Sequence, residues 1–213
     1  MTPKRDRVTA PIGTATSGHL EFARGGSRIT LRAHEEVAEL YRARFEGVAP
    51  MAFARGGRVT IEYPRLSPAG WLRPNRRAAE ITLNRSLPWT LVFGGGVSGL
   101  RADLRGLTLV SLEIGGGASD IELLLPEPHG LVTVRVAGGA SNVNLRRPAG
   151  NAVRARISGG ASKLTFDEQR LGAVGGETHL ASPGAEQAGD RYEIEIEGGA
   201  SELTVAEYDG GDA

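Results

Sequence analysis

The chain has 213 residues, which is enough for one large domain or two small ones. Its 25 basic and 25 acidic side chains cancel, so no overall charge directs it toward nucleic acid or a membrane surface. It contains no cysteine, which excludes disulfide bonds, thiolate zinc sites and thiol nucleophiles.

The N-terminal segment, residues 1–13, carries charge but lacks the apolar run that is typical of a secretory signal. No stretch of the sequence approaches the about 18 apolar residues that a membrane-spanning helix needs. We therefore expect a cytoplasmic protein without membrane insertion.

Residues 1–78 are expected to hold degenerate copies of a repeat that is clearer farther along the chain, with a Pro-rich loop at 64–78. Residues 41–47 parallel residues 153–159, which predicts a strand that leads into a corner. A further corner is predicted at Gly56-Gly57, ahead of an alternating apolar segment.

The repeat is clearest in residues 79–207, where a corner of two glycines, a small residue and a serine recurs. Its first glycines are Gly95, Gly116, Gly138, Gly159 and Gly198. These starts lie 21, 22, 21 and 39 residues apart, which indicates a repeat of about 21 residues with an insertion at 167–189. The serines that end the motifs are Ser98, Ser119, Ser141, Ser162 and Ser201.

Apolar residues occupy every second position on both sides of each corner, which predicts half-buried strands. The column before the corner holds Phe93, Ile114, Val136, Ile157 and Ile196. We therefore predict an all-β solenoid that forms a single domain over residues 1–213. Its rungs are expected to stack in chain order, followed by a flexible tail at 208–213.

One outward-facing column allows the predicted order of the rungs to be checked. It reads Val92, Glu113, Arg135, Arg156 and Glu195. Opposite charges on neighbouring strands are favourable, so Glu113 beside Arg135 supports the register. Arg135 beside Arg156 is unfavourable, and the check is therefore passed only in part.

The repeated glycines and serines are interpreted as a structural ladder. None of the five serines lies in the Gly-x-Ser-x-Gly elbow of a nucleophile, and five equivalent copies favour a structural role. The glycine corners also lack the Lys-Ser/Thr that follows a phosphate-binding loop. We expect neither catalytic nor cofactor-binding residues among them.

Metal and cofactor sites are not predicted. The four histidines show no zinc-site spacing. A calcium-binding repeat would need aspartate at the position of Asp120 in every copy, but the residue there differs from one repeat to the next. A polysaccharide-acting enzyme with a β-helix fold remains an alternative. Its candidate carboxylates are Asp103, Glu113, Asp120 and Glu122.

The charges are distributed unevenly along the chain. Residues 1–78 carry 14 basic and 7 acidic side chains, whereas residues 79–213 carry 11 basic and 18 acidic side chains. A candidate interaction end on the last rung consists of Glu193, Glu195, Glu197 and Glu202. Head-to-tail or end-to-end association of copies is one interpretation, and protection of an open strand edge by these charges is the other.

The Gly-Gly-Ala-Ser rungs, residues 170–177 and the closing residues 192–196 resemble a family of uncharacterised bacterial proteins of actinobacterial type. These are adhesin-like, cell-envelope-stress-associated β-helix repeat proteins, and the resemblance covers nearly the whole chain. It implies a single-stranded right-handed β-helix and no catalytic residues.

We therefore expect a non-enzymatic scaffold or interaction protein without a cofactor. Its partner is predicted to be a protein, including a second copy of this chain, and not nucleic acid. A partner- or ligand-binding module in envelope-stress signalling is the alternative within the same class.

Overall fold

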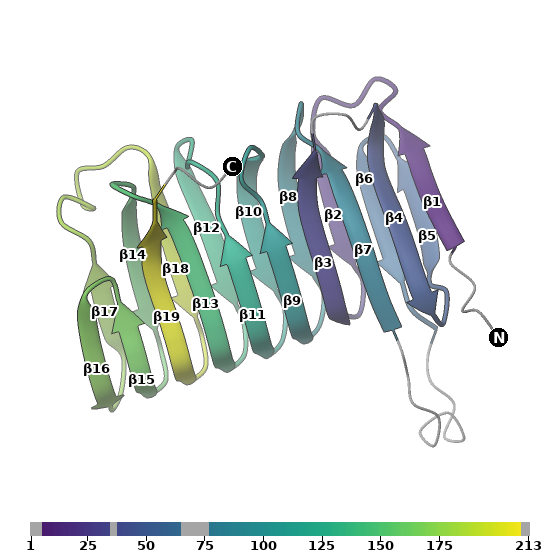
Figure 1. Ribbon diagram of the computed structural model, residues 1–213. Helices are drawn as coiled ribbons and strands as arrows, with labels where there is room; N and C mark the ends of the chain where they lie inside the picture. Colours follow the sequence, from purple (N-terminus) through teal and green to yellow (C-terminus); the bar gives the residue numbers. More distant parts are fainter. Residues whose placement is uncertain (1–5, 35–37, 65–76, 210–213) are drawn as a thin grey trace, which may run out of the picture.

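The computed structural model describes residues 6–34, 38–64 and 77–209, which form β-strands joined by turns and loops (Figure 1). The expected Pro-rich loop and tail lie largely outside the described residues. The strands of the described part are β1 (Asp6–Pro11), β2 (Gly18–Phe22), β3 (Gly26–His34), β4 (Glu39–Gly47), β5 (Met51–Arg55), β6 (Arg58–Glu62), β7 (Arg77–Asn84), β8 (Pro88–Phe93), β9 (Val97–Asp103), β10 (Thr108–Ile114), β11 (Ala118–Leu124), β12 (Leu131–Val136), β13 (Ala140–Pro148), β14 (Ala152–Ile157), β15 (Ala161–Phe166), β16 (Gln169–Val174), β17 (Thr178–Ala181), β18 (Arg191–Ile196) and β19 (Ala200–Tyr208).

These strands form two sheets, which lie as two layers (Figure 1). Sheet A has ten strands in the order β1-β4-β7-β3-β9-β11-β13-β19-β15-β16. Sheet B has nine strands in the order β17-β14-β18-β12-β10-β8-β2-β6-β5. Each clear repeat contributes the strand before its corner to sheet B and the strand after its corner to sheet A.

The core lies between the two sheets, because the alternating apolar residues point inward from both. In sheet B the neighbouring residues Leu91, Leu112, Val134 and Ile194 are all buried. The matching neighbours in sheet A are Leu100, Ile121, Val143 and Leu203. The period-2 pattern therefore reports correctly which side of these strands faces the core next to the corners. It is wrong at Val110, for which the pattern predicts an inward position and which is 48% exposed, because the register of β10 shifts between Leu109 and Ser111.

The fold is all-β, but the predicted single-stranded right-handed β-helix is wrong. The two sheets are mixed: their central strands are parallel, whereas β1, β4, β5, β16 and β17 pair antiparallel with their neighbours. The arrangement is a sandwich-like stack of strands and not a closed solenoid. Antiparallel strands at both ends of the stack replace the further parallel rungs that the periodicity had led us to expect.

The predicted chain order of the rungs is also wrong at the C-terminal end. β18 pairs with both β12 and β14, and β19 pairs with both β13 and β15. The last repeat is thus inserted between the two repeats that precede it. The insertion at 167–189 supplies the edge strands β16 and β17.

The N-terminal third departs from the repeat in two places. Residues 41–47 lie in the antiparallel strand β4 of sheet A, whereas residues 153–157 lie in the parallel part of sheet B. Gly56 and Gly57 do not form a corner between sheets. Both have positive φ, 56° and 83°, and they close a two-residue hairpin between β5 and β6.

The corners of the central repeats require glycine because their backbones stack closely. A Cβ on Gly116 would lie 2.6 Å from the backbone nitrogen of Gly96 in the neighbouring corner. The residue that directly follows the serine of each motif has a positive φ, which places its backbone in the left-handed region. The residues there are Arg28, Gly99, Asp120, Asn142, Lys163 and Glu202.

Candidate functional site

The five predicted serines lie side by side on sheet A, next to the corners. Cα pairing relates Ser98 to Ser119, Ser119 to Ser141, and Ser201 to both Ser141 and Ser162. Ser27 extends the row beside Ser98, a member that was not predicted. Its Gly25-Gly26-Ser27 motif lacks one residue of the corner and was assigned only to a degenerate copy.

The five predicted corner glycines also form one column. Backbone hydrogen bonds join Gly138 to Gly116 (3.1 Å), Gly198 to Gly138 (3.2 Å) and Gly159 to Gly198 (3.1 Å). Gly95 lies in the next corner, where a Cβ on it would meet the backbone of Arg24. This geometry explains the glycines by close packing of the backbone.

The four glutamates of the candidate interaction end do not lie at an end of the stack. They lie on or next to β18 and β19, which have neighbouring strands on both sides. Glu193 accepts a hydrogen bond from Arg154 (3.5 Å), Glu197 pairs with Arg135, and Glu202 pairs with Lys163. Insertion of the last repeat therefore turns the expected acidic end into an internal set of ion pairs.

The carboxylates of the enzyme alternative are divided between the two outer faces. Glu113 lies on sheet B, where it accepts a hydrogen bond from Arg135 (3.3 Å). The other three lie on sheet A. Their partners are Arg105 for Asp103 (2.8 Å), Asn142 for Asp120 (2.7 Å) and Arg101 for Glu122 (3.2 Å).

The surroundings shift the pKa of several side chains, among them Asp103, His19 and Tyr192. The Arg105 side chain donates hydrogen bonds to Asp103 and holds the pKa of that carboxyl below its usual range. Burial, with a smaller contribution from Arg58, lowers the pKa of His19. Burial raises the pKa of Tyr192, whose hydroxyl donates to the carbonyl of Pro126 (2.7 Å).

Within residues 6–34, 38–64 and 77–209, no group of three or more histidine or acidic side chains could hold a metal ion. The same part of the chain contains no helix with the length and hydropathy needed to cross a membrane.

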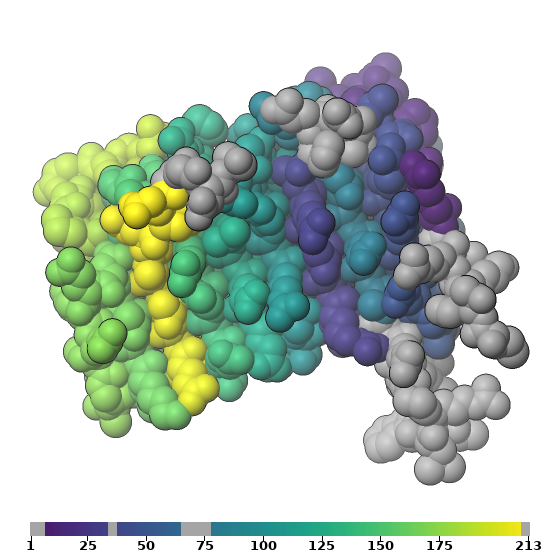
Figure 2. Space-filling view, viewed as in Figure 1, coloured from purple at the N-terminus to yellow at the C-terminus, as the bar shows by residue number. Residues whose placement is uncertain are grey.

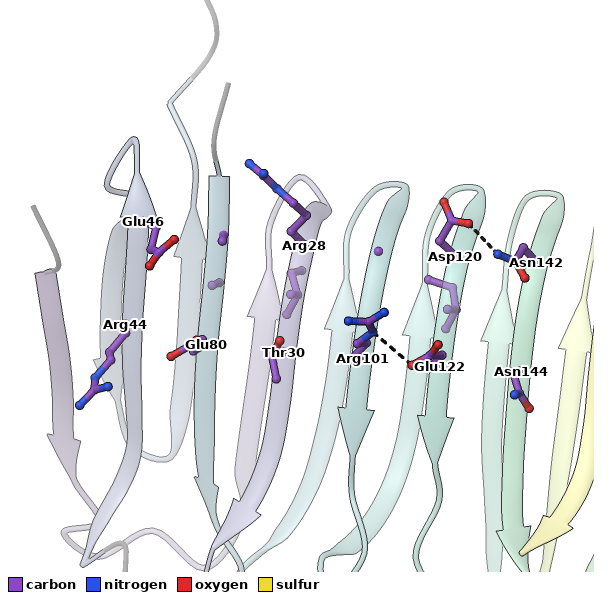
Figure 3. A pocket seen from close by; sticks show the side chains of 15 residues that line it. Arg28, Thr30, Arg44, Glu46, Glu80, Arg101, Asp120, Glu122, Asn142 and Asn144 are labelled. Atoms are coloured by element: carbon purple, nitrogen blue, oxygen red, sulfur yellow. Dashed lines mark hydrogen bonds and ion pairs between the residues drawn. The ribbon is translucent and has the colours of Figure 1, made fainter. Parts of the chain in front are cut away.

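A polar hollow lies on the outer face of sheet A, with a volume of about 640 Å³ (Figure 3). It extends across β4, β7, β3, β9, β11 and β13. Its charged and amide lining residues are Arg28, Arg44, Glu46, Glu80, Arg101, Asp120, Glu122, Asn142 and Asn144.

The hollow includes a position where the left-handed column carries no side chain. Gly99 has a φ of 69° and stands between Arg28 and Asp120 in the register of sheet A. Its neighbours in the column all carry side chains, so Gly99 leaves a gap between Arg28 and Asp120. The Arg28 side chain extends away from Gly99, and Asp120 turns toward Asn142 (2.7 Å) (Figure 3). The sequence analysis noted that this position varies but drew no site from it.

A second candidate site is the open edge of sheet B at β5. Among the described residues, β5 is the last strand of the sheet and pairs only with β6. Met51 and Phe53 point outward from this strand and are 52% and 59% exposed. Val48, which is 38% exposed, lies just before it. This site was not predicted from the sequence, although large apolar residues alternate with alanines in residues 51–54.

Comparison with known proteins places the fold. Residues 54–146, less than half of the chain, match the family described as the N-terminal domain of toast_rack, DUF2154. A candidate cell adhesion protein from Clostridium sporogenes ATCC 15579 has a structure similar to this chain, with a TM-score of 0.79 and 20% sequence identity. The match covers 97% of this chain and 100% of that one. No curated protein matches the chain.

Two further solved structures match with low TM-scores. A candidate adhesin from Bacteroides fragilis NCTC 9343 has a TM-score of 0.36 and 8% identity, over 97% of each chain. A candidate lipid-binding protein from Parabacteroides distasonis ATCC 8503 has a TM-score of 0.27 and 11% identity, over 97% of this chain and 96% of that one. The likeness to the Clostridium sporogenes structure shows a shared fold. The comparisons support neither an actinobacterial origin nor Gly-Gly-Ala-Ser rungs as a family signature.

Proposed function

We propose that this protein is a non-enzymatic interaction module that binds a protein partner by strand addition at the open edge of β5. The observation that carries the proposal is the concentration of exposed apolar side chains there. Three of the five large apolar side chains that are exposed in the described residues, Val48, Met51 and Phe53, lie in or beside β5.

The β5 edge has few of the features that protect sheet edges from other strands. An edge strand exposes unpaired N–H and C=O groups, which natural proteins block with proline, bulges or charges. β1 has a shift in register beside Pro11, and β17 has only four residues. β5 has neither, and its only charged residue is Arg55 at its end.

The backbone of β5 can accept an added strand. In an antiparallel hairpin closed by a two-residue turn, the pairs alternate between hydrogen-bonded and non-hydrogen-bonded. Arg55 and Arg58 close the hairpin, so the N–H groups of Ala52 and Ala54 face the open edge. An added strand would bond to these groups and cover Met51 and Phe53.

The charges beside the edge indicate the kind of strand that fits. Arg55 lies opposite Arg58, whose side chain is 59% exposed. Glu21 pairs with Arg58 (3.3 Å), whereas Arg55 lies on the edge strand itself. We therefore propose a partner segment that alternates apolar residues with aspartate or glutamate.

The test measures binding of labelled ten-residue peptides that alternate valine with glutamate, by fluorescence anisotropy. Ala52→Pro removes an N–H that faces the edge, a position where proline costs an edge strand little. Phe53→Glu places a charge in the contact. Both variants should lose binding, and Val110→Glu, at an apolar residue exposed elsewhere on sheet B, should bind like the wild type. Equal binding by all four proteins would contradict the proposal.

A second candidate function is ligand binding in the hollow on sheet A. The hollow is lined by both arginines and carboxylates, among them Arg101 and Glu122 beside the gap at Gly99, a mixture of charges that favours a zwitterionic ligand such as a free amino acid (Figure 3). Gly99→Asn should fill the gap without backbone strain, because Asn142 already adopts the same left-handed conformation in this column. Loss of amino-acid-dependent chemical shift changes in this variant would support the candidate function, and unchanged shifts would reject it.

A further inference from the structure

The last of the clear repeats lies inside the stack, between the two repeats that precede it in the sequence. We call β18 and β19 the C-terminal rung, and we call the space between β12–β13 and β14–β15 the slot. The yellow strand β19 runs between the green strands β13 and β15 (Figure 2). In the two sheets, β14 and β15 are therefore joined to β12 and β13 only through the C-terminal rung.

The charges of the C-terminal rung match both sides of the slot. On one side Glu197 pairs with Arg135 of β12. On the other side Glu193 lies 3.5 Å from Arg154 of β14, and Glu202 pairs with Lys163 of β15. The rung is thus recognised by ion pairs on both flanks as well as by its backbone.

Buried contacts fix the rung in register. Ile194 lies between Val134 and Ala155, and all three side chains are buried. The hydroxyls of Tyr192 and Tyr208 donate to the carbonyls of Pro126 and Leu125, both at 2.7 Å. These bonds connect the rung to the loop that follows β11, so the slot specifies one position for it.

An empty slot would not close favourably on itself. Direct pairing of β12 with β14 in the register that each shares with β18 would place Arg135 beside Arg156. Like charges directly opposite one another destabilise a sheet. The slot therefore favours a rung that carries acidic side chains over closure by its own walls.

Only one covalent connection holds the rung to the strands before it. Residues 182–190 join β17 to β18. This connection spans up to about 30 Å when extended. Its ends are held where Val153 N–H donates to Ser182 (3.0 Å) and Gly130 N–H donates to Asp190 (2.5 Å), and Ala185 in its middle is buried.

We infer that the C-terminal rung is exchanged between two copies of this chain, each filling the slot of the other. The occupant is a second copy because its rung reproduces every ion pair, apolar contact and tyrosine bond described above. Exchange of an identical element between protomers changes the path of the connection and keeps the contacts of the element, which is how domain-swapped dimers form. This inference is independent of partner binding at β5.

Disulfide trapping tests the exchange, because the chain has no cysteine of its own. Ser141 of β13 and Ser201 of β19 are Cα partners across one wall of the slot. Neighbouring parallel strands lie about 4.8 Å apart, within the Cα range of disulfides. Full-length S141C and S201C chains are mixed, refolded together from guanidinium chloride at increasing concentration, and oxidised. We expect a covalent heterodimer whose yield rises with protein concentration.

The control mixture uses S98C and S119C chains, whose serines are Cα partners on β9 and β11, away from the slot. The yield of covalent heterodimer in this mixture should not exceed the yield of covalent dimer that each single variant forms by itself. A chain with S141C and S201C together should close its own disulfide at low concentration, which verifies the geometry. If that chain closes but the mixed S141C and S201C chains never exceed the control, the inference is overturned. Adding Phe53→Glu to both chains should leave the heterodimer yield unchanged, which separates this result from the β5 proposal.

Discussion

Arg135 and Glu195 are Cα partners on neighbouring parallel strands, although they lie sixty positions apart in the chain. Glu195 is also the Cα partner of Arg156, so it separates two arginines that chain-order stacking would place together. With Glu113 on the other side of Arg135, the signs alternate across four strands of sheet B. Insertion of the last repeat therefore removes the unfavourable pair that the predicted order contained.

Reversing the central charge of this row should weaken the fold. Glu195→Arg places three cationic side chains on adjacent strands, and like charges in this position are destabilising. We expect a lower midpoint of urea unfolding than in the wild type, with Glu195→Gln intermediate. Added salt should reduce the difference, because these side chains are partly exposed and are screened. A Glu195→Arg protein as stable as the wild type at low salt would show that the alternation contributes nothing.

The inward positions of the central strands should not tolerate charge. Val134 is 2% exposed, between Leu112 and Ile194. Val134→Asp would bury an unpaired carboxylate there, at a cost comparable with the about 5–15 kcal/mol that stabilises a typical domain. We expect the variant to lose its cooperative thermal transition in circular dichroism. Val110→Asp makes the same change at an outward, exposed valine of β10 and should melt like the wild type. Similar melting of the two variants would mean that the assignment of inward faces is wrong.

The sequence predicts the faces of the strands better than their neighbours. Alternation around Ile114 and Ile121 reports which side chains point inward, because a strand has a period of two. The alternation carries no information on the spatial order of the strands, because parallel repeats with the same pattern can lie side by side in any order. The repulsion between Arg135 and Arg156 was the one signal against chain order, and it did not specify the alternative.

The candidate sites could not be predicted from the sequence, because they too depend on which strands are neighbours. Met51 and Phe53 follow the same alternation as core residues, and only the position of β5 at a sheet edge exposes them. Gly56-Gly57 resembles a corner because both structures need backbone conformations that glycine adopts. The hollow at Gly99 depends on neighbouring strands that lie far apart in the chain, on β3 and β11.

Substitution of a corner glycine should be costly even by alanine. A Cβ on Gly116 would lie 2.6 Å from the nitrogen of Gly96 and 3.0 Å from the carbonyl carbon of Gly95, both backbone atoms. The stacked corners would have to separate, and such overpacking costs about 1–3 kcal/mol. Gly172→Ala is the control, because a Cβ at Gly172 meets no atom within 4 Å. Urea unfolding should show the loss for Gly116→Ala alone, and equal stability of the two variants would contradict the stacking of the corners.

His19 should make stability depend on pH. Burial, followed by the nearby charge of Arg58, lowers the pKa of His19 below the ordinary value of 6.5. The unfolded chain then binds the proton more tightly than the folded chain. The contribution of neutral His19 to stability is therefore complete above pH 6.5 and is lost as the pH falls through the lower, folded pKa. Differential scanning calorimetry should show a smaller fall of Tm with acidification in His19→Gln than in the wild type. His179→Gln is the control, because that side chain is 65% exposed, and it should keep the wild-type profile. A His19→Gln profile parallel to that of the wild type below pH 6.5 would exclude His19 as the source.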